Sequence, residues 1–278
     1  MKNLTGVGLG LRREMLGELQ SVLPNEVDFW EVAPENWIPL GGKYHKTLSE
    51  FTRSSTFVTH GLSLSIGSPD PLDINFVKEV KHFLDEHQIT FYSEHLSYCS
   101  GNGHMYDLMP IPFTPEAIKH VAERVKQVQD IIERPLLLEN VSYYAAPGQE
   151  MTEIEFTNAI LEESDCQLLL DVNNIYVNSI NHNYDAIEFL SALPTKRIAY
   201  GHIAGHYNEA DDLIVDTHGA DVISPVWQLL EKAYEVHGVF PTLLERDFNI
   251  PPISELLKEV AKIRAIQAQF SEIEKRSA

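Results

Sequence analysis

The 278-residue chain carries 41 acidic and 21 basic side chains, which gives it a formal net charge of −20 at pH 7. Because nucleic acids and anionic membranes bind through Lys and Arg, this balance argues against both as partners. Hydrophobic residues make up 44% of the chain, enough for a sizeable core, and no apolar run is long enough to span a bilayer.

Two features bear on the cell compartment. Cys99 and Cys166 show no Cys-x-x-Cys spacing, so we interpret them as reduced thiols and not as a disulfide framework. The first ten residues, MKNLTGVGLG, lack the long apolar segment of a secretory signal. We therefore expect a cytoplasmic protein.

The predicted elements alternate in type along the chain. Short runs rich in apolar and β-branched residues are typical of buried strands, and longer amphipathic stretches lie between them. Eight runs are predicted as strands, namely Val7–Leu11, Val27–Ala33, Thr56–His60, Ile89–His95, Leu136–Asn140, Gln167–Val172, Arg197–Ile203 and Pro241–Arg246.

Several predicted helices have recognisable ends. An N-cap Thr followed by Pro begins one helix, a capping box begins the next, and Ser-Pro and Gly bound a third. These helices are expected from Thr114 to about Glu133, over Phe156–Ser164 after the Thr152/Glu155 box, from Ser224 to Gly238, and from about Ser254 to Phe270.

Eight β–α alternations in a chain of this length predict a closed (β/α)₈ TIM barrel of the xylose-isomerase-like kind, formed by one domain over residues 1–278. An open doubly wound sheet is the competing architecture. The early glycines Gly6, Gly8 and Gly10 do not support a dinucleotide site, because no strand precedes them and their spacing is not G-x-G-x-x-G.

Six consecutive predicted strands end in a His, Asp or Glu after an apolar run. In a closed parallel barrel these ends meet at one face, where active sites lie. Carboxylates gathered in a partly dry pocket must be protonated, paired with bases or bound to cations. Arg246 is the base found among these strand ends, so metal ions are the economical interpretation. The six residues are His60, His95, Glu139, Asp171, His202 and Glu245.

Mixed imidazole and carboxylate ligands suit iron, manganese or zinc better than calcium or magnesium. The segment after the seventh strand adds further ligand types. Asp216 and His218 are two residues apart, so in an extended backbone both face the same side and are expected to fold over the pocket. His206 follows His202 by four, a metal spacing on a helix, but Gly205 argues against a helix there. Glu209, Asp211 and Asp212 are interpreted as solvated loop surface.

Other polar residues near the strand ends have more than one interpretation. Asn173 and Asn174 are turn formers, or one of them is a ligand or a donor that orients Asp171. Glu31 lies in the second strand and Glu35 and Asn36 follow it, and all three are expected in a rim or supporting role. The segment 178–185 is interpreted as a loop that either meets substrate or caps the next helix.

A series of motifs then points to a known family. GVGL, EVAPENW, THGLSLSIG, SEHLSY, LLLENVSYY, LLLDVNNIYVN, NHNYD, GHIAGH, DTHGADV, PVW and LLERD occur in this order between Gly6 and about Ile266. Together they resemble the multinuclear non-haem iron-dependent oxidases, a TIM-barrel family that includes the iron enzyme of methanobactin biosynthesis. The resemblance covers nearly the whole chain.

The resemblance implies two or three iron ions and dioxygen as co-substrate. It also implies a cysteine-containing precursor peptide, made on the ribosome, as substrate, and often a partner protein that presents it. Glu139, His95 and Asp171 are expected at the catalytic centre, with Glu139 as a bridging carboxylate. The implied iron ligands are His60, His95, Glu139, Asp171, Asn174, His202, Asp216, His218 and Glu245.

Three other functions use similar residues. A divalent-metal sugar isomerase or epimerase of the xylose-isomerase-like type also places Glu, Asp and His at strand ends, but needs no dioxygen. A metal-dependent barrel endonuclease is disfavoured by the acidity of the chain. A non-catalytic metal-binding protein would hold the ions without turnover.

Overall fold

The computed structural model describes residues 4–19 and 22–277, and within them eight parallel strands close into a barrel. Neighbouring strands pair in chain order around the barrel, and the first strand pairs with both the second and the last. The eight predicted strands and the predicted TIM barrel are therefore confirmed. The barrel strands are β1 (Val7–Gly10), β2 (Phe29–Val32), β3 (Thr56–His60), β4 (Tyr92–His95), β7 (Leu136–Glu139), β8 (Gln167–Asp171), β9 (Ile198–Ile203) and β12 (Thr242–Leu244).

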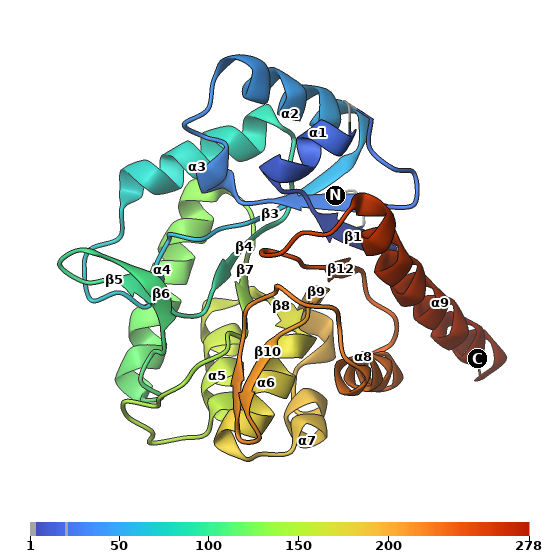
Figure 1. Ribbon diagram of the computed structural model, residues 1–278. Coiled ribbons are helices and arrows are strands. Elements are labelled where there is room, and N and C mark those ends of the chain that lie inside the picture. The colour runs from blue at the N-terminus through green and yellow to red at the C-terminus, as the bar shows by residue number, and fades with distance from the viewer. Residues whose placement is uncertain (1–3, 20–21, 278) are drawn as a thin grey trace.

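Helices surround the barrel (Figure 1). The longest, at the C-terminal end, packs against β1 and β12 and so covers the place where the barrel closes. The helices are α1 (Leu16–Leu19), α2 (Gly42–Ser54), α3 (Ile74–Glu86), α4 (Pro115–Ile132), α5 (Glu153–Ser164), α6 (Val172–His182), α7 (Ala186–Ser191), α8 (Ser224–His237) and α9 (Ile253–Ser277). Among the described residues, no helix combines the length and the apolar character needed to cross a bilayer.

The predicted helix ends follow the capping chemistry of the sequence. Thr114 caps α4 by accepting a hydrogen bond from the amide of Ala117, and Pro115 occupies the first helical position. The Thr152/Glu155 capping box is present at the start of α5. Gly238 ends α8 with φ of 76°, in the left-handed half of the map where glycine has no Cβ penalty.

One prediction about the segment 178–185 is wrong. Its first half is not a loop, because α6 begins directly after β8 and extends to His182. Asp171, the last residue of β8, is also the N-cap of this helix and accepts the Asn174 amide. The capping alternative is confirmed at the other end, where Asp185 caps α7.

Two short hairpins add to the barrel and were not predicted. β5 (Tyr98–Ser100) pairs with β6 (His104–Met109) after β4, and β10 (Tyr207–Ala210) pairs with β11 (Leu213–Val215) after β9. The segment that follows His202 is therefore a strand pair and not a helix. Its acidic residues Glu209, Asp211 and Asp212 are exposed, as expected.

The inside of the barrel is layered. One apolar layer is formed by strand residues that point inward, among them Phe29, Val58, Leu137, Leu169, Tyr200 and Leu243. Side chains two positions further along a strand point to the same side. The next layer toward the carboxyl ends is therefore made by Glu31, His60, Glu139, Asp171, His202 and Glu245.

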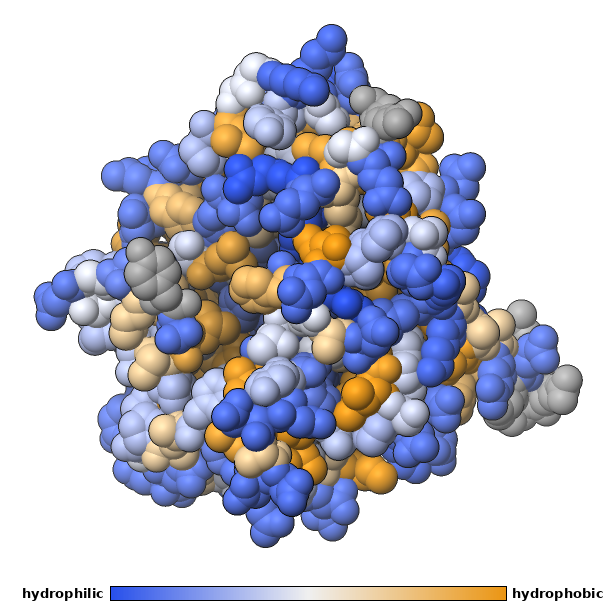
Figure 2. Space-filling view, viewed as in Figure 1, coloured by the Kyte–Doolittle hydropathy of each residue, from blue (hydrophilic) through white to orange (hydrophobic). Residues whose placement is uncertain are grey.

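Outside this interior, a larger apolar core lies between strands and helices. Hydrophilic residues cover most of the face shown in Figure 2, with hydrophobic residues in small separate groups. The chemistry of the protein is thus concentrated at the carboxyl end of the barrel.

Candidate metal centre

The polar layer at the carboxyl end of the barrel is nearly inaccessible to water. His202 and Asp171 have no exposed surface, and Glu139, Glu245 and His60 are 2–5% exposed. Burying charged groups is costly unless they are paired or bind cations. Within the described residues, donor atoms of this layer and its neighbours fall into three overlapping groups, each compact enough to hold a metal ion.

The first group consists of His60, His95 and Glu139. Glu139 Oε2 lies 3.3 Å from His60 Nε2 and 3.4 Å from His95 Nε2, and the two imidazole nitrogens are 3.1 Å apart. Because β3, β4 and β7 are adjacent in the barrel, their last residues are held side by side.

The second group consists of Glu139, Asp171, His202 and Glu245. His202 Nδ1 lies 3.0 Å from Glu245 Oε2, 3.3 Å from Glu139 Oε1 and 3.9 Å from Asp171 Oδ2. Three carboxylates thus surround one imidazole nitrogen in a site without exposed surface.

The third group consists of His218, Glu245 and Asp247. His218 Nδ1 lies 3.3 Å from Glu245 Oε2 and 3.2 Å from Asp247 Oδ2. His218 adopts a left-handed backbone, with φ of 48°, which turns the segment after β11 back over the barrel. Asp216 Oδ1 lies 2.7 Å from His218 Nε2, and His218 lines the cavity at the barrel mouth.

The groups share carboxylates, which links them into one chain of donors. Glu139 belongs to the first and second groups, and Glu245 to the second and third. A carboxylate has two oxygens, so each can serve two neighbouring cations. At Glu139, one oxygen faces His60 and His95 while the other faces His202.

Many donor atoms in this region lack hydrogen bonds. Buried polar atoms in folded proteins nearly always have a partner, so a cluster without partners needs an explanation. The atoms that have no hydrogen-bond partner among the described residues include His95 Nδ1, Asp171 Oδ2, Asn174 Oδ1 and His206 Nε2. The same holds for Glu139 Oε1, His202 Nδ1, His218 Nε2 and Glu245 Oε2, which meet oppositely charged groups of the site at ion-pair distance without hydrogen-bond geometry. Several cations among these atoms would satisfy them, and imidazole with carboxylate suits iron, manganese or zinc.

Neighbouring residues fix which nitrogen of each imidazole is free. Ser93 Oγ donates to the Thr59 carbonyl, so it accepts from His60 Nδ1 at 2.8 Å and leaves the Nε2 lone pair for the site. Glu31 Oε2 accepts from His202 Nε2 at 3.0 Å, which leaves Nδ1 free among the carboxylates. Such contacts set the orientation of metal-binding histidines.

The asparagines predicted after β8 are both buried within α6. The backbone N–H of Asn174 donates to Asp171 Oδ1, and its side-chain Nδ2 donates to the Asn140 carbonyl. The side-chain Oδ1 of Asn174 is left without a hydrogen-bond partner. Asn173 donates to Asp216 Oδ1 at 3.0 Å and accepts from His206 Nδ1 at 2.7 Å. His206 lies outside the three groups.

Electrostatics without a cation are unbalanced. Burial lowers the pKa of His60, but the Glu139 carboxylate outweighs it and the pKa is raised to about 9. Burial and the neighbouring His60 lower the pKa of His95 to about 4. Burial raises the pKa of Asp171 well above its usual range, and the nearby Glu139 raises it further. Without a cation, the Asp171 carboxyl therefore favours its protonated form, whereas a bound cation would favour the ionised form.

Arg246, the base found among the predicted strand ends, does not face the site. It is buried, but its guanidinium turns outward to Asp221 and to Glu259 of α9, at 2.9 and 3.0 Å. The base at the site is Arg12, which follows β1, forms an ion pair with Asp247 and lies 3.6 Å from Glu245 Oε1. Neither Arg12 nor Asp247 was predicted from the sequence as part of the site. Asp247 could have been found, because it follows Glu245 by two residues in the LLERD motif.

Glu31 and Glu35 occupy the supporting positions expected of them. Glu31 is 1% exposed and holds both His202 and the Tyr200 hydroxyl, which donates to it at 2.7 Å. Glu35 Oε1 accepts hydrogen bonds from the backbone amides of Leu62 and Ser63, and so holds the loop after β3 at the mouth of the barrel.

A cavity of about 350 Å³ opens onto the donor groups. His60, His95, His218 and Glu245 line its floor, and Arg12, Leu62 and Phe248 are among the residues nearer the surface. Leu62 is 41% and Phe248 65% exposed, so two apolar side chains lie exposed among the charged residues that line this cavity. A side chain of another molecule could reach the donors from this side.

Comparison with known proteins identifies the family. The family described as RiPP precursor modification enzyme MbnB/TglH/ChrH matches residues 6–268, from the start of the barrel into α9. The chain belongs to this family. Its members are enzymes that act on the precursors of ribosomally made, modified peptides.

Related sequences match this chain over nearly its whole length. A UPF0276 protein of Shewanella sediminis is 67% identical over 278 residues, 100% of both chains. A UPF0276 protein of Pseudomonas aeruginosa is 52% identical over 274 residues, 99% of this chain and 96% of the relative.

Solved structures show the same fold at low identity. The IolI protein with a bound zinc atom superposes with a TM-score of 0.63 at 14% identity, covering 96% of this chain and 99% of that one. D-psicose 3-epimerase from Clostridium cellulolyticum H10 gives a TM-score of 0.59 at 13% identity, covering 97% and 99%. The predicted likeness to xylose-isomerase-like barrels is confirmed for the fold.

Proposed function

We propose that the protein is a cytoplasmic multinuclear non-haem iron oxidase that uses dioxygen to modify cysteine residues of a ribosomally made precursor peptide. The observation that supports this most is the chain of three donor groups linked by Glu139 and Glu245, whose buried donor atoms lack hydrogen bonds. Such a centre matches the chemistry expected from the resemblance to iron oxidases, and the family supplies the peptide substrate class.

We assign the ligands to two or three iron ions by their groups. His60, His95 and Glu139 would hold one ion, and Glu139, Asp171, His202 and Glu245 a second. A third would lie toward the segment over the barrel. Its ligands would come from the third group, His218, Glu245 and Asp247, and from Asp216, whose Oδ1 lies 2.7 Å from His218 Nε2. Asn174, whose Oδ1 has no partner beside Asp171, would be a further ligand.

When bound, the iron ions would supply the electron transfer to dioxygen that no side chain provides. The chain's own residues would place and protect the reaction. Ser93 and Glu31 hold the ring protons of His60 and His202 on the nitrogens that face away from the donor groups, and Glu139, which belongs to two groups, would help to hold two ions. His95, Glu139 and Asp171 are the catalytic residues in this proposal.

The peptide would approach through the cavity at the barrel mouth. Its cysteine side chain would pass Leu62 and Phe248 to reach the floor, where His95 is more exposed than the other ligands of its group. Arg12 neutralises part of the negative charge of Glu245 and Asp247 and so would reduce the repulsion that an approaching thiolate meets. A partner protein that presents the peptide is part of the proposal.

Oxygen uptake tests this function. The protein is loaded with Fe(II) without oxygen, then given air and a cysteine-containing precursor peptide. We expect dioxygen consumption and a mass change in that peptide, and neither with a peptide whose cysteines are replaced by serine. Dioxygen consumption that does not depend on the cysteines would contradict peptide oxidation, and epimerisation of a ketose without oxygen would favour the sugar-epimerase alternative.

A further inference from the structure

A second group of metal-binding side chains lies outside the barrel, between α2 and α3. His45 comes from the first turn of α2, Glu86 is the last residue of α3, and His87 follows as the C-cap. One nitrogen from each imidazole and one Glu86 oxygen lie within 4.8 Å of one another. Ligands of one zinc ion lie less than twice the metal–ligand bond of roughly 2.0–2.2 Å from one another. The 4.8 Å limit is slightly larger, so small side-chain movements would bring the three atoms onto one ion.

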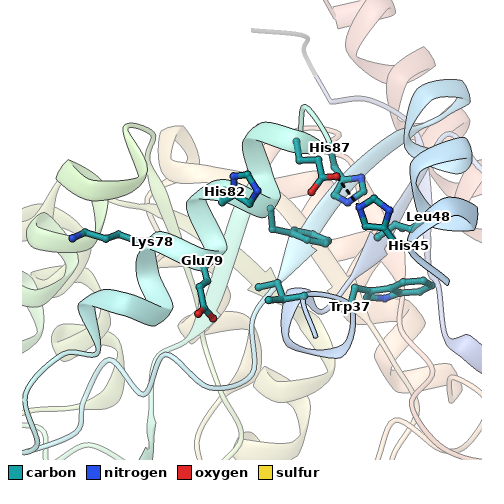
Figure 3. A pocket seen from close by; sticks show the side chains of 10 residues that line it. Trp37, His45, Leu48, Lys78, Glu79, His82 and His87 are labelled. Carbon is teal, nitrogen blue, oxygen red and sulfur yellow. Dashed lines mark hydrogen bonds and ion pairs between the residues drawn. The ribbon is translucent and has the colours of Figure 1, made fainter. Parts of the chain in front are cut away.

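The geometry of the three side chains is already close to a coordination sphere. His45 Nε2 lies 2.7 Å from Glu86 Oε1, and the His45 and His87 rings are 6.1 Å apart between centroids at an angle of 56°. Figure 3 shows the two rings next to each other at one end of a pocket above Trp37. The two helices are thus joined at this point by ligand-type atoms.

His87 has the supporting contact typical of a metal-binding histidine. It is 6% exposed, and its Nδ1 lies 3.1 Å from Thr52 Oγ1. The Thr52 hydroxyl donates to the Ser49 carbonyl at 3.5 Å, so it is free to accept the Nδ1 proton. Nε2 then keeps its lone pair for a cation.

The surroundings leave room for a solvent ligand. The group borders a cavity of about 410 Å³ whose walls include Trp37, Leu48 and Phe83. His45 and Glu86 are 47% and 37% exposed at their side chains, so a bound ion would remain in contact with water. Two imidazoles, one carboxylate and a water molecule make a four-coordinate set that zinc favours.

We propose that His45, Glu86 and His87 bind one Zn²⁺ ion, which ties α2 to α3 on the outside of the barrel. This site is independent of the metals and the reaction at the barrel mouth. His82 lines the same cavity but is not within reach of the group, which makes it a nearby histidine for comparison.

Zinc counting on iron-loaded protein tests the proposal. The loaded protein is titrated with Zn²⁺ under anaerobic conditions and desalted, and both metals are measured by plasma emission. We expect one zinc per chain with no loss of iron. Glu86→Gln and His45→Gln should each weaken zinc binding at least tenfold.

Two matched variants control for charge and for residue type. Glu50→Gln removes an acid from α2 that pairs with Lys46, and His82→Gln removes an imidazole from the same cavity. Both variants should bind one zinc ion per chain. Zinc should raise their thermal unfolding temperature as much as it raises that of the wild type. The proposal is overturned if zinc is not taken up, if it replaces iron one for one, or if all four variants bind it alike.

Discussion

The two clusters of metal-binding side chains differ mainly in burial. At the barrel mouth, His202 and Glu139 are 0% and 2% exposed, and several of their donor atoms have no hydrogen-bond partner among the described residues. Between α2 and α3, His45 and Glu86 are about half and more than a third exposed and satisfy each other directly. His and Glu side chains are therefore buried with unsatisfied donor atoms in one cluster, and exposed and paired with each other in the other.

This difference shows what burial does to a donor set. A half-exposed His–Glu pair is stable with or without a cation, because water solvates whatever the pair leaves unsatisfied. Buried donors without partners carry a desolvation cost that a cation removes. We therefore expect the barrel centre to depend on its metal, whereas the outer cluster should keep its structure without zinc and gain only the stability that zinc binding adds.

The largest effect should come from Glu139→Ala. Because Glu139 belongs to two donor groups, its loss should lower the content of both ions and reduce turnover by more than the roughly 100-fold that loss of a supporting contact costs. Metal analysis and dioxygen consumption measure both. Glu94→Gln is the control, since burial raises the Glu94 pKa to about 8 and the uncharged amide resembles the protonated carboxyl.

The next effect concerns pH in the metal-free protein. The pKa of His60 is raised to about 9, so its stabilising charge is fully present below about pH 6.5 and is lost as the pH rises through 9. Relative to His60→Gln, the free energy of unfolding of the metal-free wild type should fall by up to about 3 kcal/mol over this window. Urea unfolding at both pH values measures it, and equal pH slopes for the two proteins would contradict it.

A smaller effect is expected from Glu31→Gln. The amide can no longer accept the His202 proton as a charged partner, so the ring loses its fixed orientation and metal affinity should fall about 10–100-fold. Competition with a chelator measures the affinity. Glu35→Gln, which alters contacts to the Leu62 and Ser63 amides instead, should leave the affinity much closer to wild type.

The smallest effect belongs to the outer cluster. Without zinc, Glu86→Gln should change the free energy of unfolding by less than about 1 kcal/mol, because exposed ion pairs contribute little. Urea unfolding in the presence of a chelator measures this. A loss of several kcal/mol would mean that the pair is structural and would erase the contrast with the barrel centre.

Much of the barrel and its centre could be predicted from the sequence. Local apolar runs and capping residues such as Thr114 and Thr152 depend on nearby atoms, so strands and helix starts were found close to their true positions. The polar residue at each strand end was visible for the same reason. Closure of the barrel then followed from the number of alternations.

Long-range contacts decided the rest. Whether Arg12 or Arg246 faces the centre depends on which way each side chain turns, and that is set by Asp247 on one side and by Glu259 of α9 on the other. The same holds for His45 and His87, which are 42 residues apart in number but share one site only because α2 packs beside α3.

The sequence by itself determined the order of elements, the layer of ligand-type residues at the strand ends and the family resemblance, because these depend on residue type and spacing. Only the tertiary structure decided which donor atoms lie close enough to share a cation, which nitrogen of each imidazole is free and which polar atoms are left without hydrogen-bond partners. Those properties arise from distances between segments far apart in the chain, and no local pattern encodes them.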